Sequence, residues 1–306
     1  MKILVVGGTG ALGGHAAAYL ADKCHEVSIA ARNSPLDGTP MAKMPFHPGD
    51  YGKGDFTPER LRGFDAIIFA AGNDGRHIPP SSDAEEHLLH ANAEAIPAFV
   101  RAAREARVRR VIQLGSFYPQ AAPDLEQNNF YIRSRRLACE GARAEARPGF
   151  DVISVNAPFM VGAVPGLPSQ IFEPCVAWAE GKLPIPPFGP AGGTNFMSFR
   201  SLSQALEGAL LRGESGRAYL VGDSNLSFAD YFGLFFKAAG SLQNIETRDE
   251  AHPLLPDSAI PQGRGNWIRY QPDPVETELL GYVRNDVVDA VAEVVAQYGA
   301  ARANAV

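Results

Sequence analysis

Residues 2–14 read KILVVGGTGALGG, a short apolar run followed at once by a glycine-rich turn. Gly7, Gly10 and Gly13 have the spacing G-x-x-G-x-x-G, and the alanine-rich residues after them favour a helix. Glycine is needed where a backbone turns sharply, where a phosphate approaches closely and where a helix packs on a strand. The free amides at the start of such a helix attract a pyrophosphate. This order predicts a dinucleotide-binding unit, and the alternative is a glycine-rich turn without a ligand.

The composition narrows the class of protein. The chain has 306 residues, of which 45% are hydrophobic and 20% charged, as in ordinary globular proteins of one or two domains. A net charge of −6 argues against nucleic acid as a partner. Cys24, Cys139 and Cys175 are far apart in sequence, so we expect neither a disulfide framework nor a metal site. No apolar run is long enough to span a bilayer and the first strand leaves no room for a signal peptide, so we expect a cytoplasmic protein.

Strands alternate with helices along the first half of the chain. Five further strands are expected, at residues 27–31, at a short segment near Phe46, and at residues 66–70, 111–114 and 152–155, so that 111–114 is the fifth strand of the chain. This alternation predicts an α/β fold with a doubly wound parallel sheet, known as a Rossmann fold. We expect residues 1–156 to form the dinucleotide-binding domain. Residues 157–306 should form a smaller mixed substrate-binding region, which returns elements from about 195–222 to the first domain.

Two serine-led patterns predict where helices begin. Ser82 with Glu85 forms a capping-box pattern at the start of a long helix, in which Pro97 should cause a kink. Ser201 with Gln204 predicts the start of another helix in the second half of the chain. Each pattern places a serine hydroxyl where it can accept a hydrogen bond from the first helical amides.

The residue after the second strand reads the cofactor ribose in dinucleotide-binding folds. An acid there accepts hydrogen bonds from the 2′-hydroxyl of NAD, whereas Arg32 offers a cation suited to the 2′-phosphate of NADP. We therefore expect NADP(H) to be favoured, with NAD as the other candidate cofactor. The alternative is a solvated arginine at the end of a strand.

The chain offers side chains for proton transfer beside a nicotinamide. A tyrosine serves as proton donor when a nearby cation lowers its pKa, and a hydroxyl can hold the substrate oxygen. Ser116 ends the fifth strand, and Tyr131 lies in the next helix with Arg135 one turn later. We predict that these three residues are catalytic. Tyr118, two residues after Ser116, is a rival proton donor.

Five segments resemble the extended branch of the short-chain dehydrogenase/reductase superfamily, the NAD-dependent epimerases and dehydratases. They are Gly7 to Gly13, Gly49-Asp50, Phe69 to Gly72, Leu114 to Ser116, and Pro158 to Gly162. In that family these segments form the glycine loop, the adenine-contacting acid, the strand-four motif beside the cofactor, the catalytic serine segment and the turn near the nicotinamide. The resemblance implies an NAD(P)-dependent enzyme with cofactor contacts at Gly7, Thr9, Gly10, Ala11, Leu12, Gly13, Arg32, Asp50, Ala70, Ala71, Gly72 and Pro158.

Two positions depart from the family pattern. Tyr131-Ile132-Arg133-Ser134-Arg135 replaces the family's Tyr-x-x-x-Lys, in which the lysine holds the nicotinamide ribose and lowers the tyrosine pKa. Arginine keeps the positive charge, but its group is bulkier and planar and has a different donor geometry. Ala157 precedes Pro158 where many relatives carry arginine.

The segment expected to bind the substrate is poor in cations. Residues 157–199 hold one basic residue, Lys182, among many prolines and aromatics. This favours an oxidoreductase that moves hydride at the ketone or secondary alcohol carbon of a rather apolar small molecule. We expect that molecule between the strand ends and residues 164–190, with Trp178 and Phe188 as candidate walls. The alternative is that these aromatics belong to the core.

Two other functions stay open. A nucleotide-sugar epimerase or dehydratase must neutralise a diphosphate, for which Arg264 and Arg269 are candidates. A non-catalytic NADP-binding regulator would have kept the fold and lost the chemistry, and Arg135 in place of lysine keeps this alternative open. In each case we expect a small-molecule ligand and a monomer or homodimer.

Overall fold

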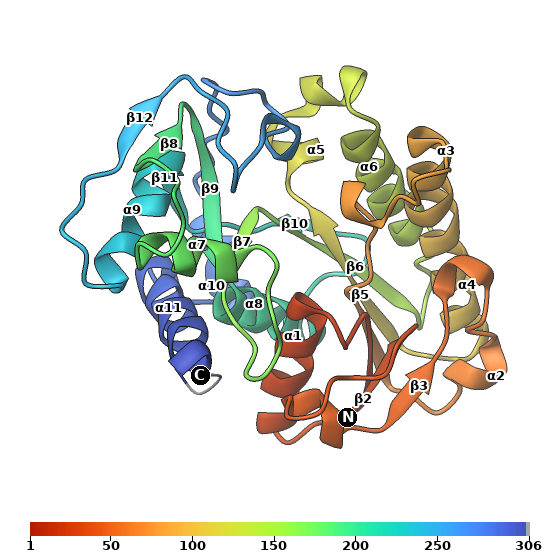
Figure 1. Cartoon of the computed structure of the whole chain (residues 1–306). Coiled ribbons are helices and arrows are strands. Elements are labelled where there is room, and N and C mark those ends of the chain that lie inside the picture. Colours follow the sequence, from red (N-terminus) through yellow and green to blue (C-terminus); the bar gives the residue numbers. More distant parts are fainter. Residues whose placement is uncertain (304–306) are drawn as a thin grey trace.

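The central sheet is parallel and has seven strands in the part of the chain that the structure describes (Figure 1). This computed structural model describes the backbone of residues 1–303 and the side chains of residues 1–299. In spatial order the strands are β10 (Ala218–Leu220), β6 (Asp151–Ala157), β5 (Arg110–Ser116), β4 (Ala66–Phe69), β1 (Lys2–Val6), β2 (Glu26–Ala31) and β3 (Phe46–Pro48). The strand order reverses at β1, which confirms the predicted Rossmann fold.

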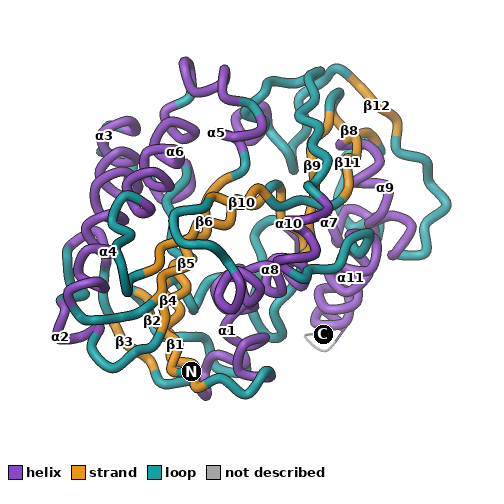
Figure 2. The backbone as a smooth tube through the Cα atoms, turned by 180° about the vertical axis from the view of Figure 1, so that it is seen from behind, coloured by secondary structure: helices purple, strands orange, loops and turns teal. Residues whose placement is uncertain are grey.

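Apolar, β-branched runs form these strands because helices cover both faces of the sheet. Helices α1 (Ala11–Asp22) and α8 (Phe199–Arg212) lie on one face, and α4 (Ala95–Glu105) and α6 (Phe130–Arg143) lie on the other (Figure 2). Successive residues of β1 point to opposite layers, as a strand requires. Ile3 and Val5 therefore pack in the core beneath α1, whereas Leu4 and Val6 pack in the core beneath α4.

The long helix predicted from residue 82 is broken in the structure. It consists of α3 (Ala84–Leu88), a π-helical turn η4 (Leu89–Glu94) and then α4. Asp83, not Ser82, caps its start by accepting a 2.8 Å hydrogen bond from the amide of Glu86. Pro97 has no amide hydrogen, and its ring crowds the carbonyl four residues before it, which lies inside the π turn. The predicted kink at Pro97 is therefore found one turn earlier, as a wider helical turn.

Residues after β6 build a smaller layer beside the sheet. The strands of its two small sheets are β11 (Ser224–Ser227), β9 (Gly193–Ser198) and β7 (Phe159–Val161) in one, and β12 (Glu246–Arg248) and β8 (Phe188–Pro190) in the other. The helices around them are α7 (Phe172–Ala179), α9 (Phe228–Ala238) and α11 (Val287–Ala303). Strand β10 and helix α8 come from this part of the chain but join the central sheet and α1. The last residues of the predicted second region, 304–306, lie outside the described residues.

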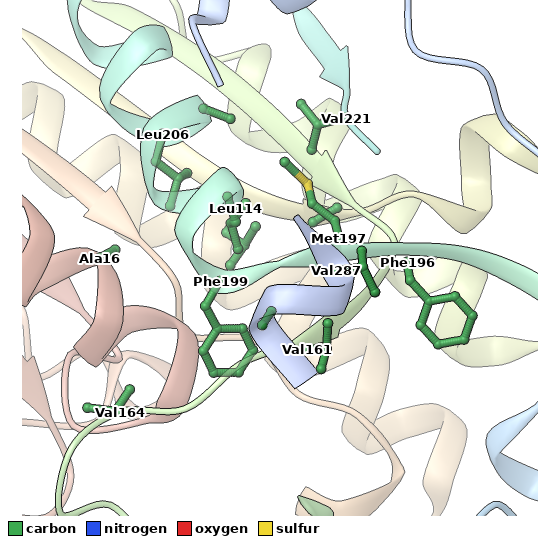
Figure 3. Close-up of a cluster of buried hydrophobic side chains, with 14 of the residues drawn as sticks. Ala16, Leu114, Val161, Val164, Phe196, Met197, Phe199, Leu206, Val221 and Val287 are labelled. Carbon is green, nitrogen blue, oxygen red and sulfur yellow. The ribbon is translucent and has the colours of Figure 1, made fainter. Parts of the chain in front are cut away.

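One apolar core connects the two layers. Ala16 of α1, Leu114 of β5, Met197 of β9 and Val287 of α11 belong to the same buried cluster (Figure 3). Phe199 joins this cluster, and its burial extends α8 beyond the start predicted at Ser201–Gln204. The helix is instead capped by the hydroxyl of the residue before Phe199, which accepts a 2.9 Å hydrogen bond from the amide of Ser201.

Short turns complete the described chain. They are η1 (Pro40–Lys43), η2 (Tyr51–Lys53), α2 (Pro58–Leu61), η3 (Gly75–His77), α5 (Tyr118–Ala121), η5 (Pro123–Asn128), η6 (Asp257–Ala259) and α10 (Pro274–Leu280). None of the described helices is long and apolar enough to cross a membrane.

Candidate active site

Segments at one edge of the sheet hold the site residues predicted from sequence. The strands are parallel, so their carboxyl ends meet at the same edge, where ligands of such folds bind. These segments contain Gly7, Thr9, Gly10, Ala11, Leu12 and Gly13 after β1, Arg32 after β2, Asp50 after β3, and Ala70, Ala71 and Gly72 after β4. Ser116 ends β5, Pro158 follows β6, and Tyr131 and Arg135 lie in the first two turns of α6.

The glycine loop is closely packed and leaves helix amides free. Gly7 has a φ of +83°, a left-handed conformation that favours glycine. A Cβ on Gly13 would lie 2.7 Å from the carbonyl carbon of Gly7, so glycine is what lets α1 begin this close to β1. Gly10 caps α1 without a side-chain hydrogen bond, which leaves the first helical amides available for an anion. The loop therefore fits the pyrophosphate of a dinucleotide.

The loops after β2 and β3 present one cation and one acid. The Arg32 side chain is exposed at the end of β2. Asp50 accepts a 2.9 Å hydrogen bond from the amide of Gly52 and so caps the short turn η2. This bond uses one carboxylate oxygen, Oδ1, of Asp50. Both residues therefore stand where the resemblance places contacts to the adenosine half of a cofactor.

Ser116, Tyr131 and Tyr118 bring three hydroxyls to the ends of β5 and α6. Ser116 is 7% exposed, and Tyr131 is half-buried. Burial, and next the neighbouring Tyr131 phenol, raise the pKa of Tyr118 well above its usual value. A phenol with a raised pKa is harder to ionise, so Tyr118 is a poorer source of tyrosinate at neutral pH. This favours Tyr131 over its rival as the proton-transferring residue.

Arg135 is a buried cation held between two strand ends. The side chain is 6% exposed, and Nη2 donates a 2.8 Å hydrogen bond to the carbonyl oxygen of Leu114 in β5. Its Nε is buried without a hydrogen-bond partner in the described part of the chain. On the other side the guanidinium lies against Gly72, at the end of β4. A buried guanidinium with spare donors is suited to bind the hydroxyls of a ligand.

Tyr51, Asn73 and Asn92 form a polar network that the sequence pattern did not reveal. Asn73 donates a 2.6 Å hydrogen bond from Nδ2 to the Tyr51 hydroxyl. Burial raises the pKa of Tyr51, so this hydroxyl stays neutral. Asn92, fully buried in the π turn, accepts from the amide of Asn73 at 3.1 Å and donates to Ser134 Oγ at 3.0 Å. The network therefore ties the loop after β4 to α6, one residue before Arg135.

A sequence signal for Asn92 did exist. It is a polar residue between Ala91 and Ala93, in a segment whose neighbours have helical apolar spacing. A buried asparagine at such a position needs hydrogen-bond partners, which only the tertiary structure identifies.

Trp178 and Phe188 lie in the core and do not line a pocket. They are 2% and 4% exposed, and both rings pack against His252, at centroid distances of 4.8 Å and 4.9 Å. This corrects the expectation that the two residues form pocket walls. The apolar character of residues 157–199 reflects this second core, because burying aromatic side chains stabilises the smaller layer.

The loop that contains Tyr270, and not the segment of Trp178 and Phe188, lies beside the site. The ring of Tyr270 is 6.5 Å from that of Phe117, the residue after Ser116, and its hydroxyl donates to the Leu220 carbonyl at 2.8 Å. In the same loop, the guanidinium of Arg269 stacks over the exposed ring of Trp267 at 3.9 Å. The loop therefore places Tyr270 near the ends of β5 and β10, and the exposed Trp267 and Arg269 belong to the same loop.

The histidines of α3 and η4 have protein partners, and an open hollow lies along a neighbouring strand. His90 contacts Glu94, and His87 contacts Asn73. Within the described residues, no group of three or more potential metal ligands is found. An open hollow of about 500 Å³ runs along the edge strand β10, lined by Gln120, Arg143, Gly216, Arg217, Ala218, Leu220 and Glu276. The strand ends that carry the glycine loop do not line it.

Comparisons with known proteins agree with this geometry. Residues 3–222 match the sequence profile of the NAD dependent epimerase/dehydratase family. No curated protein matches the chain. The dTDP-glucose 4,6-dehydratase from Streptomyces venezuelae, solved with NAD, is similar at 21% identity and a TM-score of 0.74, over 99% of this chain and 98% of that one. The UDP-glucose 4-epimerase from Bifidobacterium longum, solved with NAD+ and UDP, is similar at 16% identity and a TM-score of 0.73, over 100% of both chains.

Proposed function

The chain belongs to the NAD-dependent epimerase/dehydratase family, and we propose that it acts on a nucleotide-linked sugar as an epimerase or a dehydratase. The solved structures that share its fold include enzymes named for UDP- and dTDP-linked sugars. This proposal replaces the apolar ketone suggested by residues 157–199, because the aromatics there are used in a core. We also propose that residues 157–306 form the substrate-binding region.

The proposal rests mainly on one observation, which is that Arg269 has an aromatic partner and not an acidic one. A diphosphate needs a cation that is not already neutralised by an acid. Six of the nine cations of residues 157–299 have an acidic partner. They are Lys182 with Glu180, Arg200 with Glu293, Arg217 with Glu214 and Glu276, Arg248 with Glu246, Arg264 with Asp249 and Asp257, and Arg284 with Asp223. Arg269 instead stacks on Trp267, and no ion pair is found for it among the described residues. A guanidinium on an exposed indole suits a phosphate next to a flat base.

The residues at the strand ends fit a nicotinamide dinucleotide. The glycine loop would hold the pyrophosphate, and we propose that Arg32 gives NADP(H) a preference over NAD(H). When bound, the cofactor supplies the capacity to accept and return hydride at a sugar carbon.

We propose that Tyr131 moves the proton. Its phenolate takes the proton of a sugar hydroxyl while hydride leaves the carbon that bears that oxygen, so a carbonyl forms. The Ser116 hydroxyl donates a hydrogen bond to the same oxygen. We propose that Arg135, one helical turn away, supplies the positive charge beside this phenol.

Turnover with UDP- and dTDP-linked sugars, compared with a panel of apolar ketones, tests the proposal. We expect product only from the nucleotide sugars. Arg269→Ala should raise the KM for them about tenfold, because a charge-assisted contact to phosphate is lost. Lys237→Ala, which removes another exposed cation of the same region, is the control. Turnover of ketones alone would restore the reductase hypothesis, and cofactor binding without any turnover would favour a regulator.

A further inference from the structure

The backbone conformation of Gly72 does not require glycine, but the space beside its Cα does. It is not among the glycines with a left-handed φ, so an L-residue can adopt its conformation. A Cβ built on Gly72 would, however, overlap Nη1 of Arg135 and lie 3.1 Å from its Cζ. The missing side chain at the end of β4 is therefore the space that the guanidinium occupies.

The other side of the guanidinium is fixed as well. Nη2 donates to the Leu114 carbonyl at 2.8 Å, and the side chain is 6% exposed. The group thus lies between the end of β5 and the bare Cα of Gly72. A lysine has a single nitrogen on a narrower stem, so it cannot bond the Leu114 carbonyl and also fill the space above Gly72.

We propose that Gly72 is a positioning residue that seats the Arg135 guanidinium, so that the two residues work as a pair adapted to each other. This inference rests on the proposed function for its consequence, because the seated guanidinium is then the group that holds the nicotinamide ribose. It predicts that Arg135→Lys does not improve on the natural protein, although lysine is the family's usual residue.

A set of four proteins tests the pairing: the natural chain, Gly72→Ala, Arg135→Lys and the double variant. NADH and NADPH are titrated separately into each by fluorescence. In the natural background, Gly72→Ala should weaken binding of the preferred nucleotide about tenfold, because the methyl displaces the guanidinium. In the Arg135→Lys background the same methyl meets no guanidinium, and binding should change less than about twofold. Equal losses in both backgrounds, or no loss in either, would overturn the pairing.

A readout without cofactor separates this inference from the proposed function. The Arg135 Nε–H signal in the ¹⁵N spectrum of the apo protein is identified by its absence in Arg135→Lys. It should shift or broaden in Gly72→Ala and stay in place in Gly75→Ala, since a Cβ on Gly75 meets nothing within 4 Å. The melting temperature should fall little, because the methyl meets the tip of a flexible side chain. If the Arg135 signal does not move in Gly72→Ala, Gly72 does not position the guanidinium and the inference is wrong. If none of the four proteins binds a nucleotide, only the proposed function is contradicted.

Discussion

Arg135 and His252 each bury a nitrogen without a hydrogen-bond partner among the described residues, in two different regions of the molecule. Arg135 Nε lies at the strand ends, and His252 Nε2 lies in the aromatic cluster of the smaller layer. Arginine keeps its charge in proteins. Burial instead lowers the pKa of His252 to about 4, so this histidine is neutral at physiological pH. Its ring lies 4.7 Å from Phe232 and 4.8 Å from Trp178.

The difference shows which kind of buried polar group indicates a site. His252 is neutral, and aromatic rings fill the space around it, so it belongs to a core. Arg135 retains its charge, keeps spare donors and lies beside a glycine and two other site segments. A charge held with incomplete pairing costs stability, and we propose that a ligand completes the pairing of Arg135.

The largest expected effect comes from removing the phenol of Tyr131. Tyr131→Phe should lower kcat by about 10²–10⁴, because the variant lacks the hydroxyl that we propose transfers the proton. Steady-state turnover of a nucleotide sugar measures it. Tyr118→Phe is the matched control and should keep kcat within a few-fold. Full turnover in Tyr131→Phe together with loss in Tyr118→Phe would assign the proton to the loop after β5.

The two tryptophans of the chain should separate core from site. Trp178 is 2% exposed and its Nε1 donates to the Ile185 carbonyl at 2.8 Å. Trp178→Ala should lower the free energy of unfolding by about 3–5 kcal/mol and leave NADH affinity unchanged in the folded protein. Trp267→Ala should cost about 1 kcal/mol or less, yet weaken binding of UDP. Urea denaturation and calorimetry measure these effects, and reversed outcomes would exchange the two roles.

We propose that the charge of Arg32 sets the cofactor preference. In the natural protein NADP(H) should bind about tenfold to hundredfold more tightly than NAD(H), since a charge-assisted phosphate contact contributes about 1.5–3 kcal/mol. Arg32→Asp should remove or reverse this preference, whereas Arg62→Asp, just after α2 and exposed, should keep it. Titration calorimetry with both nucleotides measures it. Equal affinities in the natural protein would show that Arg32 does not contact the 2′-phosphate.

His252 should carry part of the acid sensitivity of the fold. Its pKa of about 4 lies below the unfolded value of about 6.5. The unfolded chain therefore takes up this proton first, and the stability contributed by the neutral ring falls as pH drops from about 6.5 to 4. Linkage gives a loss of about 2 kcal/mol at about pH 5 relative to about pH 8.

His252→Phe keeps a ring in the cluster and removes the titrating group. The loss of unfolding free energy between about pH 8 and about pH 5 should therefore shrink by about 2 kcal/mol. His15, whose pKa burial also lowers to about 4, remains in both proteins and does not affect the difference. Identical pH dependence with and without His252 would show that the ring is protonated as easily in the folded state as in the unfolded state.

The sequence by itself determined the sheet and the residues at its edge. Residues 2–14 contain an apolar run, glycines at fixed spacing and a helix start, and these constraints are local. Parallel strands then bring Arg32, Ser116 and Arg135 to one edge without further information. Helix boundaries near Pro97 and Phe199 were predicted less well. Crowding by the proline ring changes the first boundary and burial of Phe199 in the core changes the second, and neither effect can be read from local sequence signals.

Only the tertiary structure decided which cationic side chains are left free to bind a ligand. Local spacing does not reveal that Arg264 is neutralised by Asp249 and Asp257, whereas Arg269 stacks on the indole of Trp267. Nor does it reveal that Gly72, which follows β4, adjoins Arg135 of α6, the long helix that follows β5. Pairing, burial and steric space depend on contacts between distant segments, and these contacts form only when the chain is folded.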